Sequence, residues 1–288
     1  MVYLDNFTFP DDEQEFDFIL EIKRKCYNSF YPFKVLSARA FERIDFEAVT
    51  ILYGGNGCGK TTALNVIANK LNLERQSPFN SSSFMDNYVE MCSYELNEDC
   101  SRIPEGSRII TSDDVFDFML NLRALNEGID SKREELFEEY LDAKYSKFKF
   151  KSMEDYDQLK KVTQARSKTQ SSYVKNNLMG NVREHSNGES AFMYFTETIK
   201  DNALYLLDEP ENSLSIPRQL ELLKFLEDSA RFFGCQFVIS THSPFLLSMK
   251  GAKIYDMDEN PVDIKKWTEL NNVRQMYEFF KKHEGEFD

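Results

Sequence analysis

The sequence lacks several features that would each point to a particular class of protein. No run of about 18 apolar residues occurs in the 288 residues, so we expect no helix inserted in a membrane. The opening stretch, MVYLDNFTFPDDEQEF, is acidic and lacks the basic-then-apolar pattern of a secretory signal. The five cysteines are scattered without a CxxC pair, so neither a disulfide framework nor a zinc site is indicated. These absences predict a cytoplasmic protein.

Histidine and positive charge are also scarce. Only three histidines occur (His185, His242 and His283), which argues against a histidine-rich metal cluster. The net charge is −14, whereas a general nucleic-acid binder is usually basic. Residues 144–183 are the exception, with ten basic and three acidic residues. This stretch is either a solvated helical surface or a contact for nucleic acid or an effector protein.

Apolar periodicity predicts an α/β fold from both ends of the chain. Continuous apolar runs indicate buried strands at 48–53 (AVTILY), 203–207 (ALYLL) and 237–240 (FVIS). Apolar residues at helical spacing follow the first two strands, over 64–71 and over 216–233, and Gly234 is placed to cap the second helix. Strands that alternate with helices imply a largely parallel sheet.

The middle of the chain has a different pattern. From a cap at Thr111 or Ser112, apolar residues recur at a spacing near 3.5 as far as Tyr140, which is typical of a narrow helical seam. The stretch 158–177 has few apolar residues, so it forms at most the second half of an antiparallel hairpin. We therefore expect one domain formed by residues 1–112 and 184–288, with a helical insertion, or arm, over 113–183.

The strongest motif is the glycine-rich loop at residues 54–61, GGNGCGKT, which fits GxxxxGK[ST] between a predicted strand and a predicted helix. Such a loop turns several backbone N–H groups toward phosphate oxygens, and the helix adds its positive end. Lys60 is expected to reach the β- and γ-phosphates of ATP, and Thr61 to ligate Mg²⁺. The other predicted ATP contacts are Gly54, Gly55, Asn56, Gly57, Cys58, Gly59 and Thr62.

A second motif, LYLLDE at 204–209, matches a Walker B strand. Its apolar residues form the strand, and its two acids stand where the strand ends. Asp208 is predicted to hold Mg²⁺, and Glu209 to orient or deprotonate the attacking water. The expected ligands are therefore ATP and Mg²⁺.

A third segment, HSNGES at 185–190, lies shortly before the Walker B strand and resembles the ABC signature LSGGQ. Ser186 and Gly188 are retained, whereas His185, Asn187 and Glu189 replace the leucine, a glycine and the glutamine. A hydroxyl and an N–H group at a helix start suit a γ-phosphate, so Ser186, Gly188 and Glu189 are predicted ATP contacts.

Four segments together, GGNGCGKTT, HSNGES, LYLLDEPENSLS and FVISTHSPFLL, resemble the RecF/SMC-like branch of ABC ATPases. They resemble more closely the small single-chain AAA-type ATPases grouped with that branch. The resemblance covers residues 32–115 and 184–288. It implies a P-loop NTPase with an ABC-type head, made of a mixed sheet core and a β lobe. It also implies that His242 is the switch histidine and that 211–215 form a D-loop; for the Q-loop, Gln76 and Asn80 both remain candidates.

The resemblance implies a function as well. It predicts ATP hydrolysis, with Lys60, Glu209 and His242 as catalytic residues, at the interface of a head-to-tail homodimer. Each ATP would join Lys60 of one copy to Ser186 of the other, so hydrolysis would switch the dimer in DNA maintenance or anti-phage defence. Two alternatives remain open: the ATP-binding subunit of an ABC transporter, and an ATPase regulator of an effector nuclease or toxin.

Overall fold

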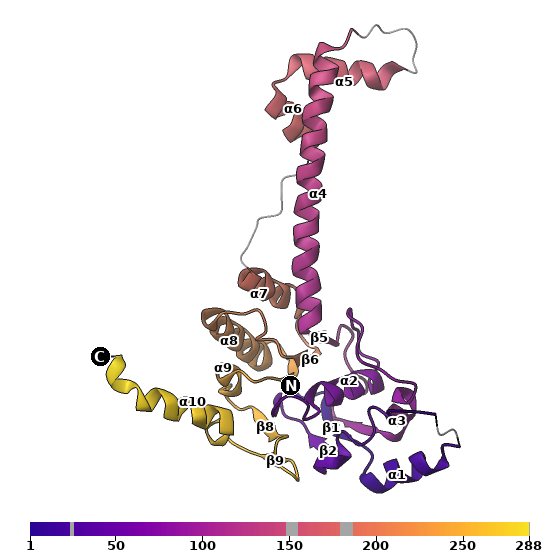
Figure 1. Cartoon of the computed structure of the whole chain (residues 1–288), viewed down its shortest axis with the longest axis vertical. Coiled ribbons are helices and arrows are strands. Elements are labelled where there is room, and N and C mark those ends of the chain that lie inside the picture. Colours follow the sequence, from indigo (N-terminus) through magenta and orange to yellow (C-terminus); the bar gives the residue numbers. More distant parts are fainter. Residues whose placement is uncertain (24–25, 148–154, 179–186, 288) are drawn as a thin grey trace. The chain divides into compact units, whose positions relative to one another are not determined.

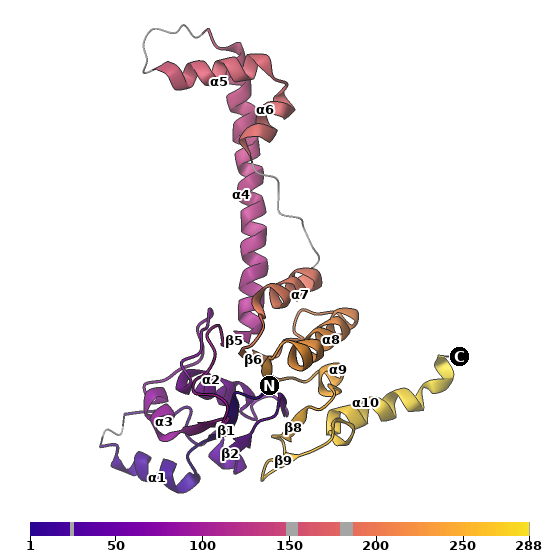
Figure 2. The same cartoon turned by 180° about the vertical axis from the view of Figure 1, so that it is seen from behind.

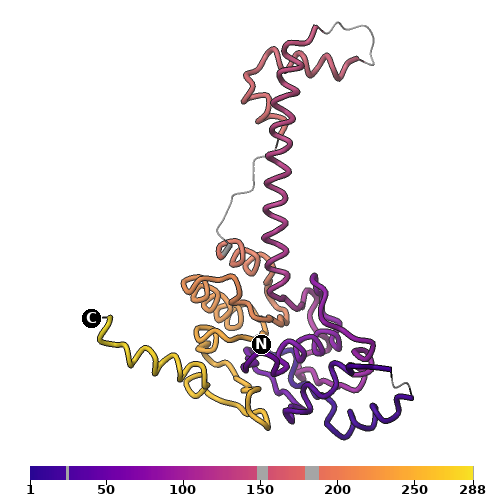
Figure 3. The backbone as a smooth tube through the Cα atoms, viewed as in Figure 1, coloured from indigo at the N-terminus to yellow at the C-terminus, as the bar shows by residue number. Residues whose placement is uncertain are grey.

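The computed structural model describes residues 1–23, 26–147, 155–178 and 187–287 (Figure 1). The chain divides into two compact units. One contains Met1–Phe116 and Asn187–Asp288, and the other contains Asp117–Ser186. Within the first unit, the indigo-to-purple and the orange-to-yellow parts of the chain lie side by side (Figure 3).

The first unit is built on a six-stranded sheet with the order β5-β6-β7-β3-β8-β9. Its strands are β3 (Val49–Tyr53), β5 (Arg108–Thr111), β6 (Leu204–Asp208), β7 (Gln236–Ser240), β8 (Lys253–Asp256) and β9 (Asp263–Ile264). All neighbouring pairs are parallel except β8 with β9. Because β7 separates β3 from β6, the glycine loop and Asp208 follow two strands that are not adjacent.

Helices cover this sheet, as its all-buried strands β3 and β7 require. They are α2 (Lys60–Lys70), α7 (Asn187–Thr198), α8 (Ile216–Phe232) and α9 (Pro244–Leu247). The last helix, α10 (Asn271–Lys282), extends away from the sheet (Figure 1), and Val273 is its one buried residue. The predicted end of α8 is confirmed, because Gly234 adopts a φ of 67° just after it. Short 3-10 turns are η1 (Ser37–Arg39), η3 (Trp267–Glu269) and η4 (Glu284–Glu286).

A second, antiparallel sheet with the order β2-β1-β4 forms a small lobe. It contains β1 (Leu4–Thr8), β2 (Arg43–Asp45) and β4 (Ser93–Leu96), and the same part of the chain supplies α1 (Asp12–Glu21) and α3 (Met85–Met91). Phe7 and Ile44 of this lobe share one apolar core with Leu64 of α2 and Leu206 of β6. The predicted combination of a mixed sheet core and a β lobe is therefore confirmed.

One buried side chain, Gln236, joins the two sheets. Its Oε1 accepts the backbone N–H groups of Tyr3 at 2.8 Å and Leu4 at 2.9 Å. Its Nε2 donates to the carbonyl oxygens of Leu4 at 2.8 Å and Glu47 at 3.2 Å. Since Gln236 is fully buried, these backbone groups have no water to replace it.

We expect Gln236→Leu to lower the free energy of unfolding by about 3 kcal/mol, since it leaves buried donors unpaired. Urea denaturation at equilibrium measures this change. Gln275→Leu is the matched control, because Gln275 is exposed and bonds only locally to Asn271 on α10. Equal stability of the two variants would contradict the role of Gln236.

The second unit is helical and has its own small core. It holds most of α4 (Ser112–Tyr145), followed by α5 (Tyr156–Ser167) and α6 (Gln170–Asn177). Figure 2 shows the two short helices beside the end of α4. Their contact buries Leu136, Tyr140, Ala143, Val162, Ala165, Tyr173 and Val174. The chain thus returns as two short helices against the last turns of α4, and not as one helix along its length.

Within the described ranges of the chain, no helix is both long enough and apolar enough to cross a membrane.

Candidate functional site

The phosphate loop connects β3 to α2, and its shape depends on glycine. Gly57 and Gly59 adopt φ angles of 82° and 103°, in the left-handed region that favours glycine. At Gly54 a Cβ atom would lie 2.7 Å from Cys58 Sγ, so only glycine fits there. Burial raises the pKa of the Cys58 thiol, which therefore stays protonated and packs within the loop.

Lys60 begins α2 and is only 5% exposed. Its ammonium donates to the carbonyl oxygens of Gly54 at 2.7 Å and Gly55 at 3.1 Å. The positive charge is therefore held against the loop itself, at the start of the helix. Among the other predicted loop contacts, Asn56 and Thr61 are exposed, and Thr62 is buried and accepts a hydrogen bond from Tyr31.

Asp208 and Thr61 meet at the end of β6. The Thr61 hydroxyl donates to Asp208 Oδ1 at 3.1 Å, and the Ser240 hydroxyl donates to the same oxygen at 2.5 Å. Burial raises the pKa of Asp208, while these two hydrogen bonds lower it. A bound cation would also relieve the cost of burying this carboxylate.

The Asp208 and Thr61 pair fits Mg²⁺. The ion prefers oxygen ligands and usually takes one or two from protein, with the rest from water and substrate phosphates. In the described part of the chain, no group of three or more His, Cys, Asp or Glu residues is placed to bind a metal.

Glu209 and His242 form the neighbouring part of the site. Glu209 Oε1 lies 3.4 Å from His242 Nε2, and Glu209 Oε2 accepts a hydrogen bond from the Asn212 side chain at 2.9 Å. Glu209 has a φ of 49°, an unusual value for a non-glycine residue, and its N–H bonds to the Ser240 carbonyl at 3.0 Å. His242 Nε2 is itself buried, and among the described residues it has no hydrogen-bond partner, so Glu209 Oε1 is the polar group beside it.

A second carboxylate, Glu211, holds the backbone that carries His242. Glu211 Oε1 accepts the N–H groups of His242 at 2.6 Å and Ser243 at 3.1 Å. The Ser243 hydroxyl bonds in turn to Gln219 on α8 at 2.7 Å. The sequence placed Glu211 in the D-loop; its contact with the switch segment was missed.

A third carboxylate, Asp258, anchors the phosphate loop from the turn after β8. Its Oδ1 accepts the Gly55 N–H at 2.7 Å, and its own N–H bonds to Asp256 Oδ1 at 3.1 Å. Sequence reasoning missed Asp258 and the Ser240 hydroxyl. Ser240 could have been found, because it ends the strand that adjoins the Walker B strand. Asp258 carries no such signal, because it lies about 200 residues from the loop.

We expect Asp258→Ala to weaken ATP binding about tenfold, because one charge-assisted hydrogen bond that shapes the loop is lost. Asp258→Asn should stay within about threefold of wild type, since an amide oxygen still accepts the Gly55 N–H. Titration with a fluorescent ATP analogue measures both. If Asp258→Ala binds as tightly as the wild type, the anchoring role is wrong.

The signature segment is only partly described, because Ser186 lies outside the described residues. Gly188 and Glu189 form the first turn of α7. A Cβ atom on Gly188 would lie 3.6 Å from the carbonyl oxygen of Ser213, in the D-loop. Glu189 pairs with Arg218 of α8 at 3.1 Å. Gly188 thus lies beside the predicted D-loop of its own chain, and Glu189 lies beside the first turn of α8.

The two Q-loop candidates differ in their contacts. Gln76 Oε1 accepts a hydrogen bond from the Tyr194 hydroxyl of α7 at 3.1 Å, so it is joined to the signature helix. Asn80 is exposed. Through this contact, Gln76 links the segment after α2 to α7, the helix that carries Gly188.

Comparison with known proteins gives one family match. The family model described as "AAA domain, putative AbiEii toxin, Type IV TA system" matches residues 125–248. This match includes the signature segment, the Walker B strand and His242, but not the phosphate loop. It covers less than half of the chain. No curated protein matches the sequence.

Solved structures that are similar to this chain include an ABC transporter and two SMC head domains. One is a putative metal-chelate type ABC transporter in an inward-facing conformation (18% identity, 82% of each chain covered, TM-score 0.37). A second is the Smc head domain from Pyrococcus furiosus with bound ScpA domain (13% identity, 83% of this chain and 95% of that chain, TM-score 0.40). A third is the SMC head domain from Thermotoga maritima (13% identity, 78% of this chain and 92% of that chain, TM-score 0.34).

The family match agrees with three features of the chain itself. These are the glycine loop after β3, the acidic pair Asp208 and Glu209 at the end of β6, and His242 after β7, the strand between β3 and β6. The resemblance predicted from the sequence is confirmed as far as the family model reaches: the chain is similar to AAA-type ATPases over residues 125–248, and it has a P-loop NTPase fold.

Proposed function

We propose that the chain hydrolyses ATP at a site that a second copy of the chain completes, so that dimerisation becomes a nucleotide-controlled switch. One observation carries this proposal. The Glu209 carboxylate lies 3.4 Å from His242 Nε2, at the end of the strand whose Asp208 meets Thr61. A base, a hydrogen-bonding nitrogen and a magnesium-ligand pair therefore belong to one surface.

Each residue then has a task in the reaction. The loop amides and Lys60 bind the phosphates, and Asp208 and Thr61 hold Mg²⁺, which neutralises phosphate charge when bound. Glu209 takes the proton of the attacking water while the bond between the γ-phosphorus and ADP breaks. A neutral His242 can hydrogen-bond the γ-phosphate or the water.

The openness of this surface supports the need for a second copy. The side chains of Glu209 and His242 are 31% and 29% exposed, and Thr61 is exposed. Hydrolysis is favoured when bulk water is excluded, so an open catalytic pair calls for a cover. Gly188 lies beside Ser213 of the D-loop, and both can be presented together to the phosphate loop of a partner.

Complementation between two inactive variants tests the shared site. Lys60→Ala removes the phosphate contact of one copy, and Gly188→Asp puts a charge where the partner's γ-phosphate would lie. In a head-to-tail dimer, an equimolar mixture should regain about a quarter of the wild-type rate, because half of the dimers hold one intact site. If two folded variants show no activity in the mixture, the composite site is wrong.

The biological role proposed first is that of a switch in DNA maintenance or anti-phage defence, with nucleic acid bound by the basic stretch 144–183 of the arm. In the arm, the described part of the basic stretch is partly neutralised, because Lys161 pairs with Glu139 at 3.1 Å. A salt-dependent gel-shift series with DNA and RNA tests this role. If the chain changes neither the gel mobility of DNA nor that of RNA at low salt, and neither nucleic acid changes the ATPase rate, this role is wrong.

A second candidate role, as the ATPase regulator of an effector or toxin, is favoured by α10. Three apolar side chains of this helix, Met276, Phe279 and Phe280, are 44%, 60% and 56% exposed. They line a cavity of about 770 Å³ that also contacts His242 and Asn212. A protein bound there would sense the switch segment directly. If expression of the chain arrests cell growth and the Lys60→Ala variant alters that arrest, this role is favoured. If neither the wild type nor the variant affects growth, the result counts against it.

A further inference from the structure

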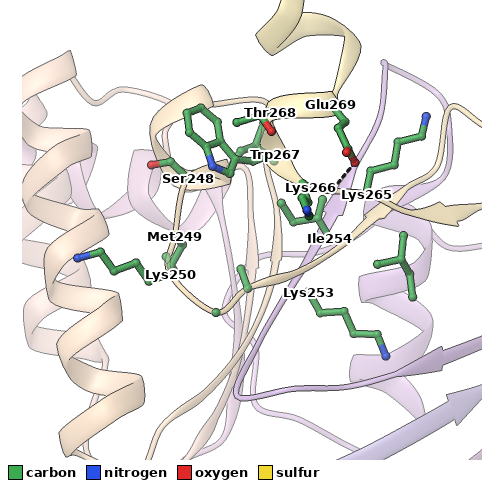
Figure 4. A pocket seen from close by; sticks show the side chains of 14 residues that line it. Ser248, Met249, Lys250, Lys253, Ile254, Lys265, Lys266, Trp267, Thr268 and Glu269 are labelled. Carbon is green, nitrogen blue, oxygen red and sulfur yellow. Dashed lines mark hydrogen bonds between the residues drawn. The ribbon is translucent and has the colours of Figure 1, made fainter.

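A cavity of about 620 Å³ lies at the amino end of β8, away from the phosphate loop that follows β3. It is open to solvent and is lined by the connection between α9 and β8, by the start of β8, and by residues from Ile264 of β9 to Glu269 (Figure 4). Its lining carries one carboxylate, Glu269, against four lysines: Lys250, Lys253, Lys265 and Lys266. In a chain of net charge −14, this is a local concentration of positive charge.

Within the described residues, the ammonium groups of three of these lysines have no carboxylate partner. The backbone N–H groups of Lys250 and Lys266 do bond to the carboxylates of Glu227 and Glu269, and the Lys253 ammonium lies 5.4 Å from the centre of the Tyr255 ring. Lys265 is paired with Asp256 at 2.9 Å and with Glu259, and these hydrogen bonds raise its pKa. No ion pair found within the described residues involves the side chains of the other three, which are Lys250, Lys253 and Lys266. Their charge is therefore available to an anionic ligand.

The cavity also holds the only tryptophan of the chain, Trp267 in η3. Trp267 is 39% exposed, and Ile264 beside it is 52% exposed. In Figure 4 the indole lies near Ser248, with Lys266 between it and Ile254. An aromatic face among unpaired cations is the combination that binds a nucleobase and its phosphates.

We propose that this cavity binds single-stranded nucleic acid, with a base stacked on Trp267 and backbone phosphates on Lys250, Lys253 and Lys266. The directions of the lysines favour a strand over a single nucleotide. Figure 4 shows Lys250 and Lys253 extending to opposite sides of the cavity, so they do not converge on one phosphate. An extended strand offers phosphates to both.

This site is separate from the basic stretch of the arm and from the ATP site. It does not require hydrolysis or a second copy. Its failure would therefore leave the proposed ATPase function untouched.

The single tryptophan makes the test direct. Titration of the full chain with oligothymidylate of about 12 nucleotides should quench the fluorescence of Trp267, since stacked bases contact the indole. With three phosphate contacts, log K should fall against log salt with a slope of about −2. Each of Lys250→Gln, Lys253→Gln and Lys266→Gln should reduce that slope by about 0.7.

Anisotropy of a labelled strand tests the tryptophan itself. Trp267→Ala should weaken binding about tenfold, and Trp267→Phe should restore most of it, because a phenyl ring still stacks. Lys224→Gln is the matched charge control, because Lys224 is exposed on α8 outside the cavity, and it should bind like the wild type.

Three results would overturn the proposal. One is the absence of quenching at low salt. Another is equal affinity of the triple lysine variant and the wild type for the labelled strand. The third is equally tight binding of thymidine monophosphate, which would assign the cavity to a free nucleotide in place of a strand.

Discussion

Replacing Lys60 with alanine is expected to abolish ATP binding and, with it, all ATP hydrolysis. The ammonium of Lys60 already lies at the loop, within 2.7 Å of the Gly54 carbonyl oxygen, so it needs little movement to reach a bound phosphate. Its removal deletes a charge-assisted contact with the phosphates and takes the donor from the Gly54 and Gly55 carbonyl oxygens, the second of which is only partly buried. A loss of about 3 kcal/mol or more, over a hundredfold in affinity, follows.

The measurement is a calorimetric titration of each folded variant with ATP and Mg²⁺. Lys70→Ala is the matched control, because Lys70 ends the same helix and bonds to the Val89 carbonyl, far along α2 from the loop. It should bind ATP like the wild type. Unchanged affinity of Lys60→Ala would contradict the assignment of the loop as a phosphate site.

The parts of the fold that could be predicted were those with a strong local pattern. The run AVTILY ends at glycines, and β3 occupies Val49–Tyr53 as expected. Helix α8 begins beyond Ser215 with proline in its first turn and ends before Gly234. In these segments the apolar period, the cap and the breaker agree, so the local sequence determines the element.

The tertiary contacts around the site were less predictable. The sequence around Gln236 does not indicate that its side chain bonds to the backbone of Tyr3 and Leu4, because these residues lie more than 230 positions away in the chain. The Asp258 contact with Gly55 likewise joins two turns that only the completed sheet brings together. Motif spacing identifies residues that touch substrate, whereas residues that position them are determined by strand order.

In the arm, too, one part of the structure could be predicted from the sequence and another part could not. A seam at a spacing near 3.5 predicted a long helix, and α4 runs over Ser112–Tyr145. The return was harder to predict, because 158–177 has few apolar residues and its core needs only Val162, Ala165, Tyr173 and Val174. Tyr173 completes the contact with a hydrogen bond from its hydroxyl to Glu139 at 2.6 Å, a pairing that periodicity does not reveal.

The second large effect is expected from Glu209→Gln, which should retain ATP binding but slow hydrolysis by about 10² to 10⁴. Glutamine has the shape of glutamate, and its amide oxygen can still accept the hydrogen bond from Asn212. It cannot take a proton from water. Asp208, Thr61 and Lys60 are unchanged, so nucleotide and Mg²⁺ should bind as before.

Phosphate release in a single turnover measures the chemical step, and sedimentation with ATP and Mg²⁺ measures the assembly. Glu90→Gln, at an exposed position of α3, is the control for loss of one charge and should hydrolyse ATP at the wild-type rate.

The two readouts of Glu209→Gln separate the roles that this residue could play. If Glu209 is the base, the Glu209→Gln variant binds ATP without hydrolysing it. The dimer that ATP joins should then accumulate as a stable species. If Glu209 only positions Asn212, glutamine should replace it without loss of the hydrolysis rate, since the hydrogen bond from the Asn212 side chain survives. A wild-type rate would therefore remove Glu209 from the chemistry. A slow rate without dimers would keep it there, and would show that hydrolysis and assembly are separate events in this chain.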